Sequence, residues 1–160
     1  MSKKRIIDEI DARILNILQN NARTQNADIA RKLKLAPSGV LERIRKLERQ
    51  GIIQSYETRI DSRAVGAGLV AFIFVTTDAP AGDLQVAKKI AGIPEVQEVH
   101  SVAGEDCYLV KLRVANTDEL AELMRKRFRN LKSIRSTRTT IVLETVKETM
   151  RFALKVPDRK

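Results

Sequence analysis

Apolar residues recur at helical spacing through most of the first sixty positions. Asp8 suits the N-cap of a first helix because its carboxylate can accept a backbone N–H. The apolar face of that helix holds Ile10, Ile14, Ile17 and Leu18. After a turn at residues 20–24, Asn26 is the predicted N-cap of a second helix from Ala27 to Leu33, with Ile29, Ala30 and Leu33 facing inward.

A third helix is predicted to begin at Pro37 and to end at Gly51, a typical C′ residue. Its apolar side holds Val40, Ile44 and Leu47. The opposite side holds Ser38, Glu42, Arg45, Lys46 and Arg49, with Gly39 and Arg43 near its edges. This order, with a turn of about three residues before the last helix, is typical of the helix-turn-helix unit.

The N-terminal end of such a last helix enters the major groove of DNA. The predicted DNA-binding residues are Pro37, Ser38, Gly39, Glu42, Arg43, Arg45, Lys46 and Arg49. Small residues at the helix start allow close approach to bases and phosphates, and the basic side chains reach the backbone. The alternative is a solvated charged face, in which Glu42 and Glu48 pair with Lys46 and Arg45.

Alternating apolar residues in IIQSYETRID predict a strand over Ile52–Asp61 that serves as a hinge. The expected domains are therefore residues 1–60 with this strand, a linker at 61–67, and residues 68–160. Strands are expected near residues 68–77, 95–104, 107–115 and 134–146. Helices are expected from Asp83 to Ala91, buried through Leu84, Ala87 and Ile90 or Ala91, and from Asn116, where Glu119 completes a capping box.

This order is a βαββαβ, ferredoxin-like unit, so the predicted fold class is α+β with an N-terminal helix-turn-helix of winged-helix type. Two helices cover one face of a four-stranded sheet, and GLVAFIFVTT is apolar on both alternating faces. The simplest cover for the second face is the same face of another copy, which predicts a symmetric homodimer.

Charge narrows the choice of partner. The 160 residues carry a net charge of +10, which favours a polyanion such as nucleic acid or an anionic membrane. No window approaches eighteen apolar residues, and the N-terminus has no apolar signal region, so a cytoplasmic protein is expected. The single cysteine, Cys107, permits no internal disulfide and fits a reducing compartment. His100 is the only histidine and has no companions for a metal site or catalytic triad, so neither metal, cofactor nor enzyme activity is expected.

Several stretches in order resemble the Lrp/AsnC (leucine-responsive, feast/famine) transcription regulators across nearly the whole chain. They are IDEIDARILNILQNNART, ADIARKLKLAPSGVLERIRKLERQGII, SYETRID, PEVQEVHSVAGEDCYLVKLRV and STRTTIVLETVKET. The resemblance implies a DNA-binding helix-turn-helix, a ferredoxin-like effector domain, dimers that assemble further, commonly to octamers, and an amino acid as effector.

In that family the effector binds between subunits near the loop joining the second and third strands of the effector domain. The expected effector residues are Gly104, Glu105, Asp106, Cys107, His100, Thr137 and Thr139. The chain departs from the family at Ala36, where a Ser or Thr cap is usual, and at Cys107, where the loop usually has an aspartate. The second departure motivates an alternative, an effector-independent protein that compacts DNA. Kinship alone suggests another, a tetrapyrrole decarboxylase of haem biosynthesis.

Overall fold

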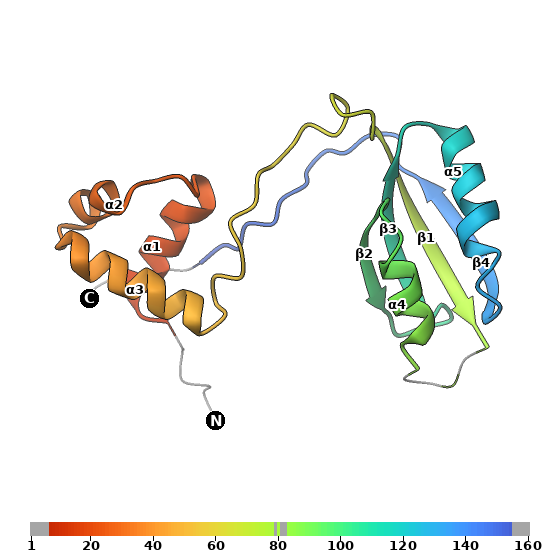
Figure 1. The fold of residues 1–160 in the computed structure, drawn as a ribbon, viewed down its shortest axis with the longest axis horizontal. Helices are drawn as coiled ribbons and strands as arrows, with labels where there is room; N and C mark the ends of the chain where they lie inside the picture. The colour runs from red at the N-terminus through yellow and green to blue at the C-terminus, as the bar shows by residue number, and fades with distance from the viewer. Residues whose placement is uncertain (1–6, 79, 81–82, 155–160) are drawn as a thin grey trace. The chain divides into compact units, whose positions relative to one another are not determined.

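The computed structural model describes residues 7–78, 80 and 83–154, which form two compact units (Figure 1). The first unit contains the described residues up to Arg59 together with those from Glu148 onward, and the second unit is Ile60–Lys147. Residues 148–154, placed with the second domain from the sequence, thus group with the first unit. The residues expected as a linker form turns in the second unit, where Ala67 N donates to Ser62 O at 2.7 Å.

Three helices make up most of the first unit: α1 (Glu9–Asn20), α2 (Asn26–Leu33) and α3 (Pro37–Arg49). The predicted Asp8 cap is confirmed, and Asp8 and Asp11 bond each other's backbone N–H groups in a capping box. The predicted Asn26 cap is wrong by one residue. Gln25 O accepts from Asp28 N and Ile29 N, so helical bonding begins at Gln25 and Asn26 is already helical.

The core of the first unit is aliphatic and joins all three helices. Its buried members are Ile14, Leu18, Ile29, Ala30, Val40 and Ile44. Leu47, the third residue of the predicted apolar side of α3, is also fully buried. Burial of each large aliphatic side chain contributes roughly 1.5–3 kcal/mol, so these inward faces fix how the helices pack. Lys34 closes the turn between α2 and α3 in the left-handed region, at φ 56°.

The strand predicted over Ile52–Asp61 is not formed in the single chain. The segment makes no sheet ladder, and its residues from Gln54 onward are exposed instead of alternating between buried and exposed. A strand requires a neighbouring strand for its backbone groups, and the sheet formed by the described residues contains only four other strands, none of which pairs with this segment. The start of the segment is held by Ile52 N and Ile53 N, which donate to Leu47 O at 2.9 and 3.2 Å. Further along, Tyr56 OH donates to Glu48 at 2.9 Å.

The C-terminal segment of the first unit is bound along α1 through its backbone. Gln19 contacts both backbone groups of Phe152: its amide oxygen accepts from the N–H at 2.7 Å and its amide nitrogen donates to the carbonyl at 3.2 Å. Asn16 donates to Leu154 O at 3.4 Å, and Arg151 donates to Asn20 at 2.9 Å. A row of side-chain amides on α1 therefore holds residues 151–154 in the way a neighbouring strand would.

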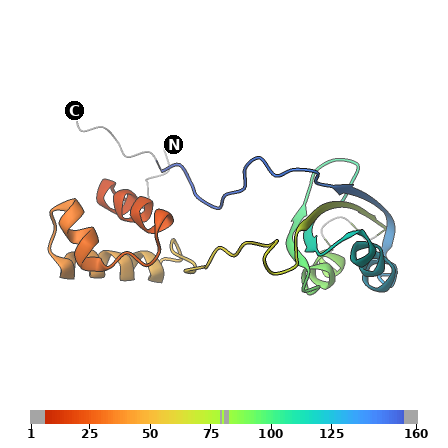
Figure 2. The same cartoon turned by 90° about the horizontal axis from the view of Figure 1, so that it is seen from above.

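The second unit is an antiparallel sheet covered by helices on one face, which confirms the α+β prediction (Figure 2). The strands are β1 (Leu69–Thr77), β2 (Val96–Ser101), β3 (Tyr108–Val114) and β4 (Ile134–Ile141), in the order β2-β3-β1-β4. The helices are α4 (Gln85–Ala91) and α5 (Thr117–Leu123), which continues as the π-helical turn η1 (Met124–Phe128). The element order is that of the split βαβ, ferredoxin-like unit.

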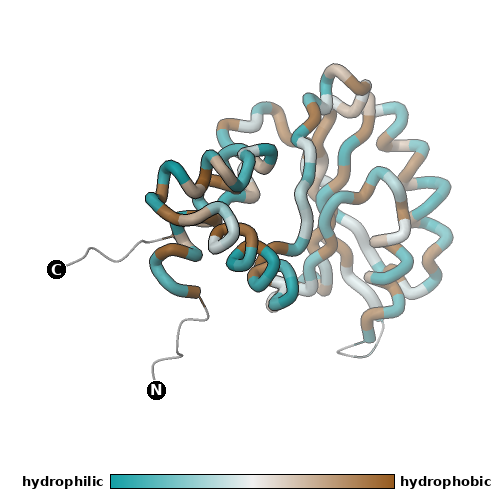
Figure 3. Tube along the Cα trace, turned by 60° about the vertical axis from the view of Figure 1, so that its left-hand side comes forward, coloured by the Kyte–Doolittle hydropathy of each residue, from teal (hydrophilic) through white to brown (hydrophobic). Residues whose placement is uncertain are grey.

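The two faces of β1 have different surroundings. Ala71, Ile73 and Val75 are fully buried under the helices, whereas Phe72 and Phe74 lie on the opposite, open face and remain half-buried. Figure 3 colours the trace by hydropathy and shows apolar and polar residues interspersed along both units. Within the described residues, no helix is long and apolar enough to cross a bilayer.

Two predicted details of the second unit are wrong. Leu84 is 48% exposed and Val86 is buried in its place, because α4 begins at Gln85, later than expected. The last strand ends at Ile141 and not near Val146, because its neighbour β1 begins at Leu69 and the last bond between the two strands joins Val142 N to Val70 O. The end of this strand therefore depends on a partner far away in the sequence.

Candidate functional site

The outer side of α3 is exposed and carries basic side chains without internal partners. The exposed residues are Ser38, Glu42, Arg45, Lys46 and Arg49. Among the residues that the structure describes, Arg45, Lys46 and Arg49 form no ion pair, and Glu48 instead accepts from Tyr56. The alternative, in which this charge is balanced along the helix, is therefore not what the structure shows.

The N-terminal end of α3 is open to a partner. Ala36 occupies the N-cap position, Pro37 is the first helical residue, and no side chain caps the helix. A Cβ atom at Gly39 would meet nothing within 4 Å, so the fold itself does not require glycine there. The small residues at this end are therefore not needed to avoid a clash within the protein, and they leave space at its surface for a partner.

Arg43 differs from the other predicted DNA-binding residues because it is paired inside the unit. Its guanidinium lies 2.6 Å from Asp8 and 2.7 Å from Asp11, and the Asp11 side chain is only 1% exposed. The bonds to Asp8 and Asp11 raise the pKa of Arg43 above its ordinary value. Burial opposes ionisation of Asp8, but the bonds from Asp11 N–H and Arg43 outweigh it and lower the Asp8 pKa. Arg43 therefore ties α3 to the start of α1.

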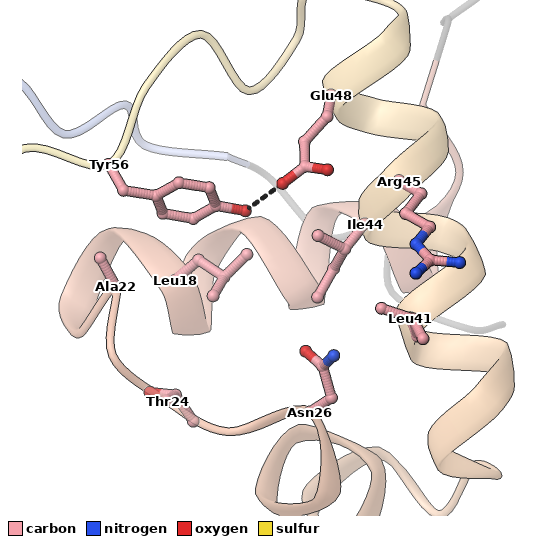
Figure 4. A pocket seen from close by; sticks show the side chains of 9 residues that line it. All are labelled: Leu18, Ala22, Thr24, Asn26, Leu41, Ile44, Arg45, Glu48 and Tyr56. Carbon is pink, nitrogen blue, oxygen red and sulfur yellow. Dashed lines mark hydrogen bonds between the residues drawn. The ribbon is translucent and has the colours of Figure 1, made fainter.

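A shallow hollow of about 310 Å³ lies beside α3 in the first unit (Figure 4). It is lined by Leu18, Ala22, Thr24, Asn26, Leu41, Ile44, Arg45, Glu48 and Tyr56. Tyr56 bridges to Glu48 across its rim, and burial followed by the bond to Glu48 raises the pKa of Tyr56 to about 12. Its polar lining residues add donors next to the exposed side of α3.

In the second unit, the loop between β2 and β3 is anchored to the end of β1. Cys107 N donates to Val75 O at 2.9 Å, and Cys107 Sγ accepts from Thr77 N at 3.4 Å. Cys107 thus has a packing role at the base of the loop. Gly104 has φ 140°, a conformation that favours glycine, and the loop turns there. Glu105 next to it is exposed and forms no ion pair within the described part of the chain.

Asp106 is the loop residue whose side chain bonds to both β1 and β4. It accepts from Arg138 at 3.0 Å and from Thr76 at 3.4 Å. The Arg138 guanidinium also lies 4.0 Å from the centre of the Phe74 ring, a cation–π geometry. Arg138 was not among the predicted effector residues. It lies between Thr137 and Thr139, which were, but successive residues of a strand point to opposite faces, so Arg138 lies on the other face of the sheet from them.

The remaining predicted effector residues lie on two different faces of the sheet, His100 on the open face and Thr137 and Thr139 on the other. Register places His100, Leu109, Phe74 and Arg138 in one row across the open face. At the β2 edge of that row, His100 contacts Glu98 at 3.1 Å. The bond from His100 lowers the pKa of Glu98; burial opposes this shift, and Lys111 adds to it. Thr137 and Thr139 pair with Val75 and Ile73, so they share the helix-covered face and lie away from Asp106.

Family models match both units. The model described as winged helix-turn-helix DNA-binding matches residues 7–54, and the one described as Lrp/AsnC ligand binding domain matches residues 70–152. The first match covers the three helices and the start of the segment after them. The second covers all four strands and the C-terminal segment as far as Phe152.

Whole-length relatives agree with the family models. The chain is 36% identical over 159 residues to the leucine-responsive regulatory protein of Escherichia coli K12, covering 96% of this chain and 97% of that protein. A similar fold, with a TM-score of 0.86 and 27% identity, is found in a transcriptional regulator–L-Met complex from Neisseria meningitidis, covering 92% and 97% of the two chains. The leucine response regulatory protein of Mycobacterium tuberculosis aligns with a TM-score of 0.80 and 32% identity, over 93% and 100%.

Proposed function

This chain belongs to the Lrp/AsnC family of DNA-binding transcription regulators, and we propose that it reads duplex DNA through α3 and responds to an amino acid bound by its second unit. The observation that carries the DNA-reading part is the outer side of α3. It combines unpaired basic side chains with an open N-terminal end. A helix of this kind presents its first turn to base edges while Arg and Lys contact phosphates on either side.

The residues of α3 then divide into two roles. Ser38 and Glu42 lie on the exposed side near the helix start, where side chains reach base edges. Arg45, Lys46 and Arg49 lie further along and contact the backbone. Arg43 holds α3 against α1, so its contribution to DNA binding is chiefly to keep the helix in place.

Selection of bound duplexes from a random pool, followed by titration of four variants, tests this division. Arg45→Ala and Lys46→Ala should weaken all duplexes by a similar factor, each lowering the salt slope of log K by about 0.9 for each bound chain. Ser38→Ala and Glu42→Ala should change which bases are selected. If all four variants weakened every duplex equally, α3 would contact only the backbone and the base-reading proposal would fail.

We propose that the amino-acid effector binds at the β2–β3 loop. An amino acid requires an anionic group for its ammonium and donors for its carboxylate. Among the residues that the structure describes, Glu105 is the exposed carboxylate of the loop and has no ion-pair partner, whereas Asp106 is already engaged by Arg138. Arg138 and the backbone N–H groups around Gly104 supply donors for the carboxylate.

A thermal-shift screen of the twenty amino acids tests the effector, with leucine and methionine first because they occur in the names of relatives. A binding amino acid at 100 times its Kd stabilises by about 2.7 kcal/mol. Glu105→Gln should abolish that shift, and Glu144→Gln, an exposed glutamate of the same unit, should preserve it. A flat screen would favour the alternative of an effector-independent, DNA-compacting protein.

We further propose that the chain works as a homodimer or a larger assembly such as an octamer, in the compartment that holds the chromosome. The open face of the sheet supports self-association, since Phe72 and Phe74 lie half-buried there without a covering helix. Two copies related by a twofold axis would present two α3 helices to two half-sites. A decarboxylase role has no residue-level support, and the relatives named above are regulators.

A further inference from the structure

Positive charge in the second unit is concentrated in one short stretch. Between Leu123 and Leu143 there are seven arginines and lysines and no aspartate or glutamate. They are Arg125, Lys126, Arg127, Arg129, Lys132, Arg135 and Arg138. The rest of Ile60–Lys147 carries six basic and eleven acidic side chains and is therefore net negative. The net positive charge of this unit thus comes entirely from that stretch.

The π-helical turn η1 exposes most of this charge. Arg129 N donates to Met124 O at 3.1 Å across five residues, and the widened turn places Leu123 and Phe128, also five residues apart, on the same buried side. In a regular helix, residues five apart point about 140° from each other. Because Phe128 anchors the turn inward, the neighbouring residues Arg125, Lys126, Arg127 and Arg129 are all exposed.

Few of these cations are neutralised within the chain. Lys126 pairs with Glu122, and Arg138 pairs with Asp106. Within the residues that the structure describes, Arg127, Arg129, Lys132 and Arg135 form no ion pair and are exposed. The bond from Lys126 is the main cause of the lowered pKa of Glu122. Arg125 contributes least to this lowering, through its charge alone and without a hydrogen bond.

We propose that the basic stretch from η1 to the start of β4 is a second DNA-binding surface, which contacts phosphates of the duplex without reading its sequence. Arginines on a short turn suit this role, because phosphate contacts need charge and reach but no fixed match to a base. DNA is the polyanion favoured here, since α3 of the same chain holds a duplex and thereby raises the local concentration of phosphates. The surface therefore adds affinity and salt dependence to what α3 provides.

The test uses the full-length protein, a long duplex containing the selected site, and the variant Arg127→Ala/Arg129→Ala. Loss of two phosphate contacts should lower the salt slope by about 1.8 for each bound chain. For each chain this makes the loss of affinity from about 50 to 200 mM salt roughly twelvefold smaller. The matched control is Lys88→Ala/Lys89→Ala, which removes two exposed charges from α4 and should leave the slope near wild type. Thermal melting of each variant confirms folding.

Charge-conserving substitution separates binding from structure. Arg127→Lys/Arg129→Lys should restore most of the slope, because a lysine still neutralises a phosphate. Equal slopes for the alanine variant and wild type would overturn the proposal, as would equal losses in the α4 control. Binding of wild type to phosphatidylserine vesicles that the alanine variant loses, with the DNA slope unchanged, would assign the surface to a membrane and also overturn it. Because α3 is intact in every variant, this outcome is distinct from failure of DNA reading itself.

Discussion

Arg43 shows how a residue on a helix that is proposed to read DNA can serve the fold. Its guanidinium reaches the nearly fully buried carboxylate of Asp11 and the N-cap carboxylate of Asp8. Removing the arginine would leave Asp11 buried without its cation, and such an uncompensated charge is costly. The pair could not be predicted from the sequence, because 32 residues separate its members and helical periodicity places Arg43 only at the edge of the polar side.

Arg43→Ala is therefore expected to destabilise the protein by about 2 kcal/mol, the loss typical of hydrogen bonds to a charged group. Urea unfolding followed by circular dichroism measures the change. Arg13→Ala is the matched control: it breaks an exposed pair with Glu9 and should cost about 0.5 kcal/mol or less. Equal costs for the two variants would contradict a structural role for Arg43.

The same cluster predicts an acid response. The folded pKa of Asp8 lies below its ordinary value of 3.8, so its ionised form contributes stability that is fully present above that value. This contribution is lost as the pH falls below 3.8 and through the folded pKa. The stability difference between wild type and Asp8→Asn should therefore shrink between pH 5 and about 2. A constant difference over this range would show that the Asp8 charge is not involved.

Tyr56 gives a spectroscopic signal for the segment after α3. Burial and the bond to Glu48 raise the pKa of its phenol to about 12, against an ordinary value of 10.0. The ultraviolet titration step that is missing in Tyr56→Phe should be centred near pH 12, and in Glu48→Gln it should move toward 10. If the step that Tyr56→Phe removes were instead centred at 10, Tyr56 would not bridge to Glu48 in solution.

At the level of elements, the start of α1 and both ends of α3 followed from the sequence, whereas the starts of α2 and α4 and the strand ends did not. Asp8, Pro37 and Gly51 define helix termini through bonds within a few residues, so local patterns were sufficient. The strand predicted at Ile52–Asp61 and the extension of β4 beyond Ile141 failed because a strand depends on a distant partner. The π turn escaped prediction because Leu120, Met124 and Phe128 also fit a regular helix.

The C-terminal segment supplies an element-level prediction. Gln19 holds both backbone groups of Phe152, so Gln19→Ala should expose that amide to solvent. Hydrogen exchange at residues 151–154 should accelerate by at least several-fold, reflecting the loss of about 1 kcal/mol for a hydrogen bond. Gln54→Ala, an exposed glutamine of the same unit, is the control and should leave the exchange unchanged. Fast exchange of Phe152 in the unmodified protein would contradict the docking.

For the whole molecule, the sequence indicated both units and the class of each site but not the partners of individual side chains. The α3 surface was predictable because amphipathicity is local, and its exposure agrees with the pattern. The loop at residues 102–107 was predicted as a region, but the sequence did not indicate that Arg138 bonds Asp106 there or that Thr137 and Thr139 lie on the other face of the sheet. Register decides such details, and register is set by pairing between distant strands.

The last prediction concerns self-association through the open face of the sheet. If the open face of the sheet joins two copies, Phe74→Glu should place a charge in that interface and convert the dimer to a monomer in sedimentation equilibrium. Leu84→Glu introduces the same charge at an exposed apolar residue on the other side of the unit and should leave the dimer intact. A dimer that survives Phe74→Glu would place the interface elsewhere.

The central claim is that the exposed side of α3 lies in a DNA groove. Hydroxyl-radical footprinting of the protein, with and without its selected duplex, measures this directly. The account predicts that side chains between Pro37 and Arg49 on the exposed side become protected from oxidation when the duplex binds, while the buried side does not change. If the duplex bound tightly while the exposed side of α3 stayed as reactive as in the free protein, the account would be contradicted.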